Sequence, residues 1–165
     1  MDASSSELCN VLTYITTQSQ FISQGVDGDL ATQGAGDQGV MFGYACIETE
    51  QTEELRGRFF PLAAALSQRL TRRLEQVHSE QIIPWIRPDG KSQVTVQIDE
   101  KSNQPVRIST IVIAAQHAPD AGPNWPDKNS LSEEERRLYI EAEIRKHVVE
   151  HAIPSSLMNL SLIHI

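Results

Sequence analysis

One helical stripe constrains the fold of this chain more than any other feature of its sequence. Between residues 62 and 77, large aliphatic residues recur at helical spacing, so their side chains share one face that another element must cover. Pro61 suits the start of this helix. Three arginines, Arg69, Arg72 and Arg73, lie off the stripe and are interpreted as a solvated face. The stripe itself consists of Leu62, Leu66, Leu70, Leu74 and Val77.

Two strand patterns follow this helix. Residues 92–98 alternate between apolar and polar side chains, which is typical of a strand with one buried face. Residues 106–115 are more continuously apolar and β-branched, which favours a central strand. The short polar connection at 99–105 indicates a hairpin, so the two strands are expected to be antiparallel neighbours. The Pro-Asp-Gly sequence that begins at Pro88 predicts a turn before the first of them.

The remaining patterns complete an α+β prediction. We expect a short helix at 4–17, a loop at 18–32 and a first strand at 39–49. Ser130 or Ser132 can cap a last helix, whose buried stripe would consist of Ile140, Ile144 and Val148. The order β-α-β-β-α predicts a two-layer sandwich, with helices on one face of a mainly antiparallel sheet.

Composition narrows the class of protein. The net charge of −8 argues against a general nucleic-acid binder, which would present a basic face. Cys9 and Cys46 suggest neither a disulfide framework nor a cysteine metal site, so we expect a reduced, cytoplasmic setting. No apolar run approaches the ~18 residues of a membrane span, so no membrane association is predicted.

A glycine-rich stretch carries the first functional signal. Residues 34–39 read Gly-Ala-Gly-Asp-Gln-Gly and satisfy the Gly-x-Gly-x-x-Gly spacing of dinucleotide-binding loops. That class of site needs a strand before the glycines and a helix after them. Here a short polar segment precedes them and a strand-like segment follows. Taken alone, the stretch indicates a glycine-rich turn that leads into a strand.

Longer strings point to a family. Residues 34–45, Gly-Ala-Gly-Asp-Gln-Gly-Val-Met-Phe-Gly-Tyr-Ala, resemble the signature of methionine adenosyltransferases, also called S-adenosylmethionine synthetases. A second string, residues 84–94, reads Pro-Trp-Ile-Arg-Pro-Asp-Gly-Lys-Ser-Gln-Val and is similar to another motif of that family. A weaker match ends at His117, where a satisfied histidine at a strand end remains the other interpretation. The resemblance runs from about residue 9 to residue 154.

The resemblance implies roles for particular residues. Gln18 and Asp37 would bind methionine. Without the family, Gln18 would be interpreted as a solvated loop glutamine, and Asp89 and Lys91 as a surface ion pair at a turn. The residues implied to contact ATP are Asp89, Gly90 and Lys91, with Lys91 in the catalytic role. The residues implied to belong to the family's flexible active-site loop are Gln18, Gln24, Gly25 and Asp27.

A competing motif lies near the end of the chain. Residues 147–151 fit His-x-x-Glu-His, a pattern known from zinc proteases. His147 and His151 are four positions apart and would share a helix face. A third ligand is needed, and no Asp, Glu or Cys follows, so we expect no zinc site.

The predicted function is therefore synthesis of S-adenosylmethionine from ATP and L-methionine, by a fragment expected to be inactive alone. The family's His-Pro-Asp and Gly-Gly-Gly-Ala-Phe-Ser segments are absent from these residues. The resemblance also implies Mg²⁺ and K⁺, with ligands outside this fragment, and a homo-oligomer. The alternative is a non-catalytic interaction module on the same scaffold.

Three regions are expected along the chain. Residues 1–32 would hold the first helix and the flexible active-site loop. Residues 33–154 would form the domain that resembles the family's central domain. Residues 155–165 have little pattern and are interpreted as a non-native tail, because residues 160–165 do not resemble what the family has there.

Overall fold

The computed structural model describes residues 10–118, 131–158 and 162–164. The chain forms two compact units, the first ending at Tyr44 and the second beginning at Ala45. The second unit contains a three-stranded sheet in the order β1-β2-β3. The elements are α1 (Gln20–Val26), η2 (Glu53–Leu55), α2 (Leu62–Ser79), β1 (Ile86–Ile98), β2 (Pro105–His117), α3 (Glu133–Ile144), η3 (Arg145–Val149), α4 (Glu150–Ala152), η4 (Ser155–Leu157) and β3 (Leu162–His164).

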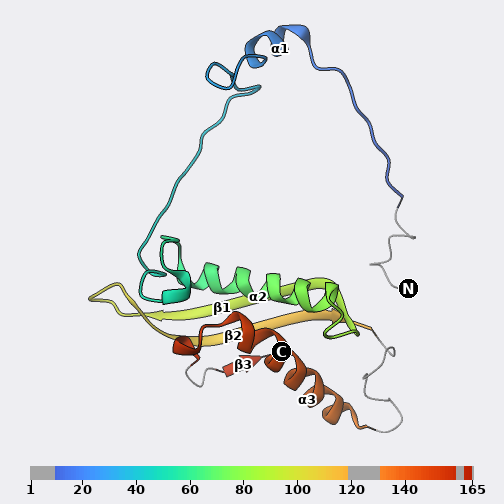
Figure 1. Ribbon diagram of the computed structural model, residues 1–165, viewed down its shortest axis with the longest axis vertical. Helices are drawn as coiled ribbons and strands as arrows, with labels where there is room; N and C mark the ends of the chain where they lie inside the picture. Colours follow the sequence, from blue (N-terminus) through green and yellow to red (C-terminus); the bar gives the residue numbers. More distant parts are fainter. Residues whose placement is uncertain (1–9, 119–130, 159–161, 165) are drawn as a thin grey trace. The chain divides into compact units, whose positions relative to one another are not determined.

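The α+β prediction is confirmed, because α2 packs on an antiparallel β1–β2 hairpin (Figure 1). Every residue of the predicted aliphatic stripe of α2 is at most 5% exposed. The stripe packs in one core with residues of the hairpin, among them Ile111 and Ile113, and with Val148 and Ile153. Burying one such side chain contributes roughly 1.5–3 kcal/mol, so this core dominates the stability of the second unit.

The hairpin follows the sequence pattern. Asp99 closes its connection, because its N–H donates to the Gln104 carbonyl at 2.9 Å and its carboxylate accepts from Ser102 N at 2.8 Å. β2 is the central strand, as predicted, since it pairs with β1 on one side and β3 on the other. The three-residue β3 runs parallel to β2 and was not predicted. A strand of three residues is too short to show the alternation of apolar and polar residues that predicts a strand.

The last helices begin as expected. Ser132 is the N-cap of α3 and forms a capping box, in which its hydroxyl accepts from Glu135 N at 3.2 Å. Ile144 and Val148 are buried, and Ile140 is half-buried, as the predicted stripe requires. η3 is a turn of π-helix, and α4 ends at Ala152, before Pro154. None of the helices in the described ranges is long and apolar enough to cross a bilayer.

Three predictions about the secondary structure of residues 4–49 are wrong. Residues 39–49 form no strand: Met41 and Phe42 are 95% and 93% exposed, and no described strand pairs with them. The helix expected at 4–17 is absent from residues 10–17, and residues 4–9 lie outside the described part of the chain. α1 forms instead within the segment expected to be a loop. The observed order therefore lacks the first strand of the predicted β-α-β-β-α arrangement.

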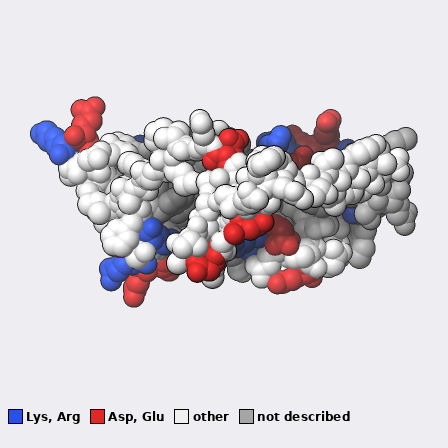
Figure 2. All heavy atoms as spheres, turned by 90° about the horizontal axis from the view of Figure 1, so that it is seen from above, with Lys and Arg blue, Asp and Glu red and all other residues white. Residues whose placement is uncertain are grey.

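The charges are distributed without a broad basic surface on the face shown in Figure 2. Acidic and basic side chains lie interspersed there among uncharged residues. This arrangement agrees with the acidic net charge of −8. It provides no extended basic surface on that face of the kind that general nucleic-acid binders use.

Candidate active site

The glycine-rich segment packs closely against the chain around α1, within the first unit. A Cβ built on Gly34 would collide with the carbonyl oxygen of Gly25. A Cβ on Gly36 would lie 3.8 Å from the side-chain nitrogen of Gln18 and 3.8 Å from Val26 Cγ2. Any side chain at Gly34 would therefore force these two segments apart.

This packing places the two residues implied to bind methionine in one neighbourhood. Gln18 lies next to Gly36, and Asp37 follows directly. Both side chains are exposed, and Asp37 Oδ1 accepts a hydrogen bond from Gln38 N at 2.7 Å. A carboxylate and a side-chain amide together can receive and orient an amino acid's ammonium and carboxylate groups. Gln24 and Gly25 lie in α1, and Asp27 caps its end.

The second candidate group lies on β1, in the second unit. Gly90 pairs with Ala115 and Lys91 pairs with Ala114 in the antiparallel ladder. The turn predicted at Pro88 is therefore wrong: the segment belongs to the strand, with an irregular register between Ile86 and Gly90. Proline has no N–H to donate to the neighbouring strand. The pairing is therefore irregular at Pro88.

The alternation of β1 separates two sets of side chains. Ser92 Oγ donates to the Ser67 carbonyl of α2 at 2.8 Å, and a Cβ on Gly90 would lie 3.1 Å from Leu74 Cδ1. These residues therefore face α2. Lys91 lies between them along β1, so its side chain is on the opposite face of the sheet, whereas Asp89 lies in the irregular stretch before Gly90. Both residues are exposed. Within the described residues, neither side chain has a hydrogen bond or an ion pair.

An unpaired ammonium and carboxylate, two positions apart on one strand, can contact a nucleotide. The ammonium can meet a phosphate oxygen as a point charge. The carboxylate can accept from a ribose hydroxyl or an amine. Gln18 and Asp37 belong to one unit, and Asp89, Gly90 and Lys91 belong to the other.

The histidines have structural partners. His117 lies at the end of β2, with its ring edge-on to Trp85 at a centroid distance of 6.3 Å. His147 Nε2 lies 3.6 Å from a Glu143 carboxylate oxygen, and His151 Nδ1 lies 3.1 Å from the Lys146 carbonyl. Among the described residues, no three His, Cys, Asp or Glu side chains are grouped so that they could hold a metal ion.

A network of acidic side chains fixes the start of α2. Glu48 accepts from Leu62 N at 2.8 Å, which satisfies one of the free N–H groups of the helix. Glu50 accepts from Gly57 N at 2.9 Å and from Phe59 N at 3.1 Å. These hydrogen bonds, that from Gly57 first, lower the pKa of Glu50 below its usual value. The loop holds Gly57 at a φ of 83°, which glycine adopts readily, and Phe59 at a φ of 49°, so the bond to Phe59 N also supports a strained backbone.

The depressed pKa of Glu50 predicts a pH dependence of stability. A carboxyl group whose pKa falls on folding stabilises the folded state above its unfolded pKa, and this stabilisation is lost as pH falls through the folded pKa. We expect Glu50→Gln to lower the melting temperature at neutral pH, and the difference to close below the usual pKa of about 4.5. The control is Glu53→Gln, whose carboxylate has no partner among the described residues. Equal effects of both changes would contradict the prediction.

The second unit is thus an α+β domain whose strand β1 carries exposed polar residues. Comparison with known families agrees with the sequence motifs. A family model described as S-adenosylmethionine synthetase, central domain, matches residues 32–165. The match covers most of the chain, which therefore belongs to the S-adenosylmethionine synthetase family.

Proposed function

We propose that this chain contributes the central domain of an enzyme that makes S-adenosylmethionine from ATP and L-methionine. The observation that carries the proposal is the exposed pair Asp89 and Lys91, which lie two positions apart on β1 and whose side chains have no partner in the described chain. Membership of the S-adenosylmethionine synthetase family supports ATP and methionine as the substrates that such a pair would contact.

The reaction forms one bond and breaks another. The methionine sulfur attacks C5′ of the ATP ribose, an S–C bond forms, and the C5′–O bond breaks with its electron pair leaving on the triphosphate. Water then hydrolyses the released tripolyphosphate. Lys91 would neutralise charge that grows on the leaving group. Asp89 would hold the ribose or an amine, with the Gly90 backbone close by.

The methionine end would be held by Gln18 and Asp37. Their task is orientation, because in-line attack requires the sulfur to face C5′ along the breaking bond. Mg²⁺, K⁺ and a homo-oligomer remain predictions from the family. The described residues offer no group of three metal-ligating side chains, so no step of this mechanism is assigned to a metal ion held by them.

The test compares two proteins. We expect the 165-residue chain to form no S-adenosylmethionine above background, because the family's His-Pro-Asp and Gly-Gly-Gly-Ala-Phe-Ser segments are absent from its sequence. A chimera that supplies both segments is expected to form the product from ATP and methionine in a chromatographic assay.

Two outcomes would overturn parts of the proposal. Product formation by the 165-residue chain alone would show that the absent segments are dispensable. A chimera that folds, binds a protein partner and binds neither ATP nor methionine would favour the non-catalytic interaction module.

A further inference from the structure

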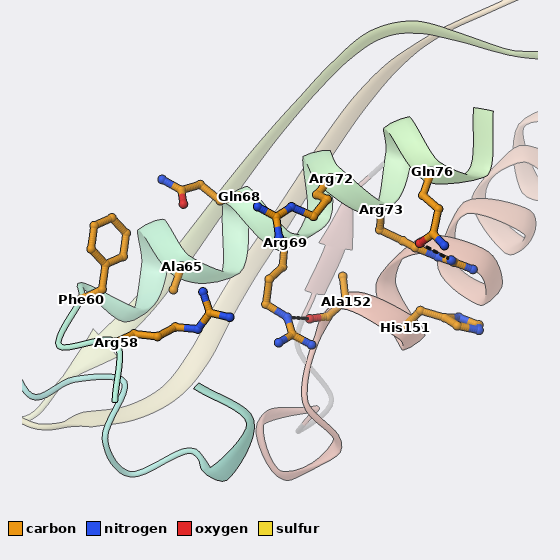
Figure 3. Close-up of a pocket in the computed structure, with 10 residues that line it drawn as sticks. All are labelled: Arg58, Phe60, Ala65, Gln68, Arg69, Arg72, Arg73, Gln76, His151 and Ala152. Carbon is orange, nitrogen blue, oxygen red and sulfur yellow. Dashed lines mark hydrogen bonds between the residues drawn. The ribbon is translucent and has the colours of Figure 1, made fainter. Parts of the chain in front are cut away.

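A cavity of about 460 Å³ in the second unit is unusually rich in arginine. It lies between α2, the loop that precedes α2, and α4, as Figure 3 shows. Its volume is in the range of sites for small molecules. The basic and aromatic residues that line it are Arg58, Arg69, Arg72, Arg73, Phe60 and His151.

Two of the arginines are fixed by the backbone. Arg69 Nε donates to the Ala152 carbonyl at 2.8 Å, and Arg73 Nε donates to the His147 carbonyl at 2.8 Å (Figure 3 draws the first). Arg73 Nη1 also donates to Gln76 Oε1 at 2.7 Å. Both side chains are half-buried, so the interpretation of this helix face as solvated is wrong for them. These contacts orient the guanidinium groups and leave their charges uncompensated.

The side chains of the other two arginines are not fixed by the backbone. Arg58 and Arg72 are exposed, and neither side chain forms a hydrogen bond or an ion pair within the described residues. In the same part of the chain, none of the four arginines of the cavity is paired with a carboxylate. Four like charges around one cavity repel each other, although the whole protein carries a net charge of −8. An anion bound between them would remove this repulsion.

We propose that this cavity binds a small, multiply charged oligophosphate or phosphate ester. Guanidinium groups match phosphate oxygens through paired N–H donors, and two of these groups are already oriented by backbone carbonyls. One negative charge would compensate one arginine, so a ligand with several charges fits the site better. Phe60 is half-buried at the rim and offers an apolar surface to the rest of such a ligand.

The test uses inorganic pyrophosphate as the probe, titrated calorimetrically into the full chain at low ionic strength. All proteins carry Lys91→Met, so that binding at the proposed ATP contact does not contribute. We expect saturable binding that weakens as salt is added. Arg72→Gln should reduce the affinity about tenfold or more, because it removes hydrogen bonds to a charged ligand. The Arg58→Gln, Arg72→Gln double variant should show no measurable binding.

Matched variants separate this site from general charge effects. Lys101→Gln makes the same change of charge in the exposed hairpin connection, outside the cavity, and should alter the affinity less than about twofold. Arg72→Lys keeps the charge and should recover part of the lost affinity. Circular dichroism checks that each variant is folded, which we expect because the side chains of Arg58 and Arg72 have no hydrogen-bond or ion-pair partners among the described residues.

Three results would overturn the proposal. The first is no saturable binding of pyrophosphate at low salt. The second is an equal loss of affinity in Lys101→Gln and Arg72→Gln. The third is tighter binding of a polyglutamate peptide than of pyrophosphate, which would identify the ligand as a carboxylate-rich chain.

Discussion

Replacing Lys91 with methionine is expected to lower turnover by about a hundredfold to a thousandfold in the chimera that supplies the family's absent segments. Methionine keeps most of the length of the side chain and removes its ammonium. The charge on the leaving triphosphate grows as the C5′–O bond breaks, so the lost contact matters most in the transition state. The loss corresponds to roughly 2.7–4 kcal/mol, by analogy with the removal of an oxyanion donor.

The same experiment separates the two candidate groups of residues. Lys91→Met should change methionine affinity little, because methionine is assigned to Gln18 and Asp37. Asp37→Asn should weaken methionine binding more than ATP binding, since it replaces a carboxylate partner of the substrate ammonium with a neutral amide. Steady-state kinetics with each substrate varied in turn distinguishes the effects. If Lys91→Met keeps turnover within about threefold of the parent, the proposed role of Lys91 is contradicted. Lys91 is then a solvated residue of the strand.

Leu70→Ala is expected to reduce the free energy of unfolding by about 2–5 kcal/mol. Leu70 is 0% exposed and lies in the middle of the stripe of α2 that packs against the sheet. Alanine has the highest helix propensity, so the change tests packing and not the stability of the helix itself. Urea unfolding followed by circular dichroism measures the effect.

Leu138→Ala is the matched control for this substitution. Leu138 also lies in a helix, α3, and is 52% exposed, so its truncation should change the free energy of unfolding by only about 0.5 kcal/mol. Equal effects of the two substitutions would show that α2 is not packed as described.

The helix and hairpin could be predicted because their signals are repeated. The period of α2 recurs through five aliphatic positions, and each of those positions is buried. The alternation of residues 92–98 and the polar connection after it specify an antiparallel pair in the same way. Local patterns of this kind do not depend on distant parts of the chain.

The wrong predictions concern features that distant contacts decide. Pro88 begins a sequence with strong turn propensity, but pairing of Gly90 with Ala115 holds the segment in the sheet. The helical period shows that Arg69 and Arg73 lie off the stripe. It cannot show that their carbonyl acceptors lie 83 and 74 positions away.

Sequence motifs, and not hydrophobic periodicity, indicate the candidate site. No pattern of hydrophobic residues distinguishes Asp37 or Lys91 from other exposed charged residues. The proximity of Gln18 to Gly36 likewise follows from how one loop folds back on another. The arginine cavity could have been suspected from the spacing of Arg69, Arg72 and Arg73 along one side of the helix. The contribution of Arg58 to the cavity could not be predicted in this way, because Arg58 lies in the loop that precedes the helix.

The pairing of β3 with β2 has a consequence for the order of folding. β1 and β2 are joined by a connection of six residues, whereas Thr110 pairs with Leu162 across more than fifty intervening positions. The entropy of loop closure rises with the length of chain enclosed, so the hairpin can form early, and docking of β3 is delayed until the rest of the unit is assembled. By the same reasoning, β3 is the first strand to detach in local opening, and its departure turns β2 from a central strand into an edge.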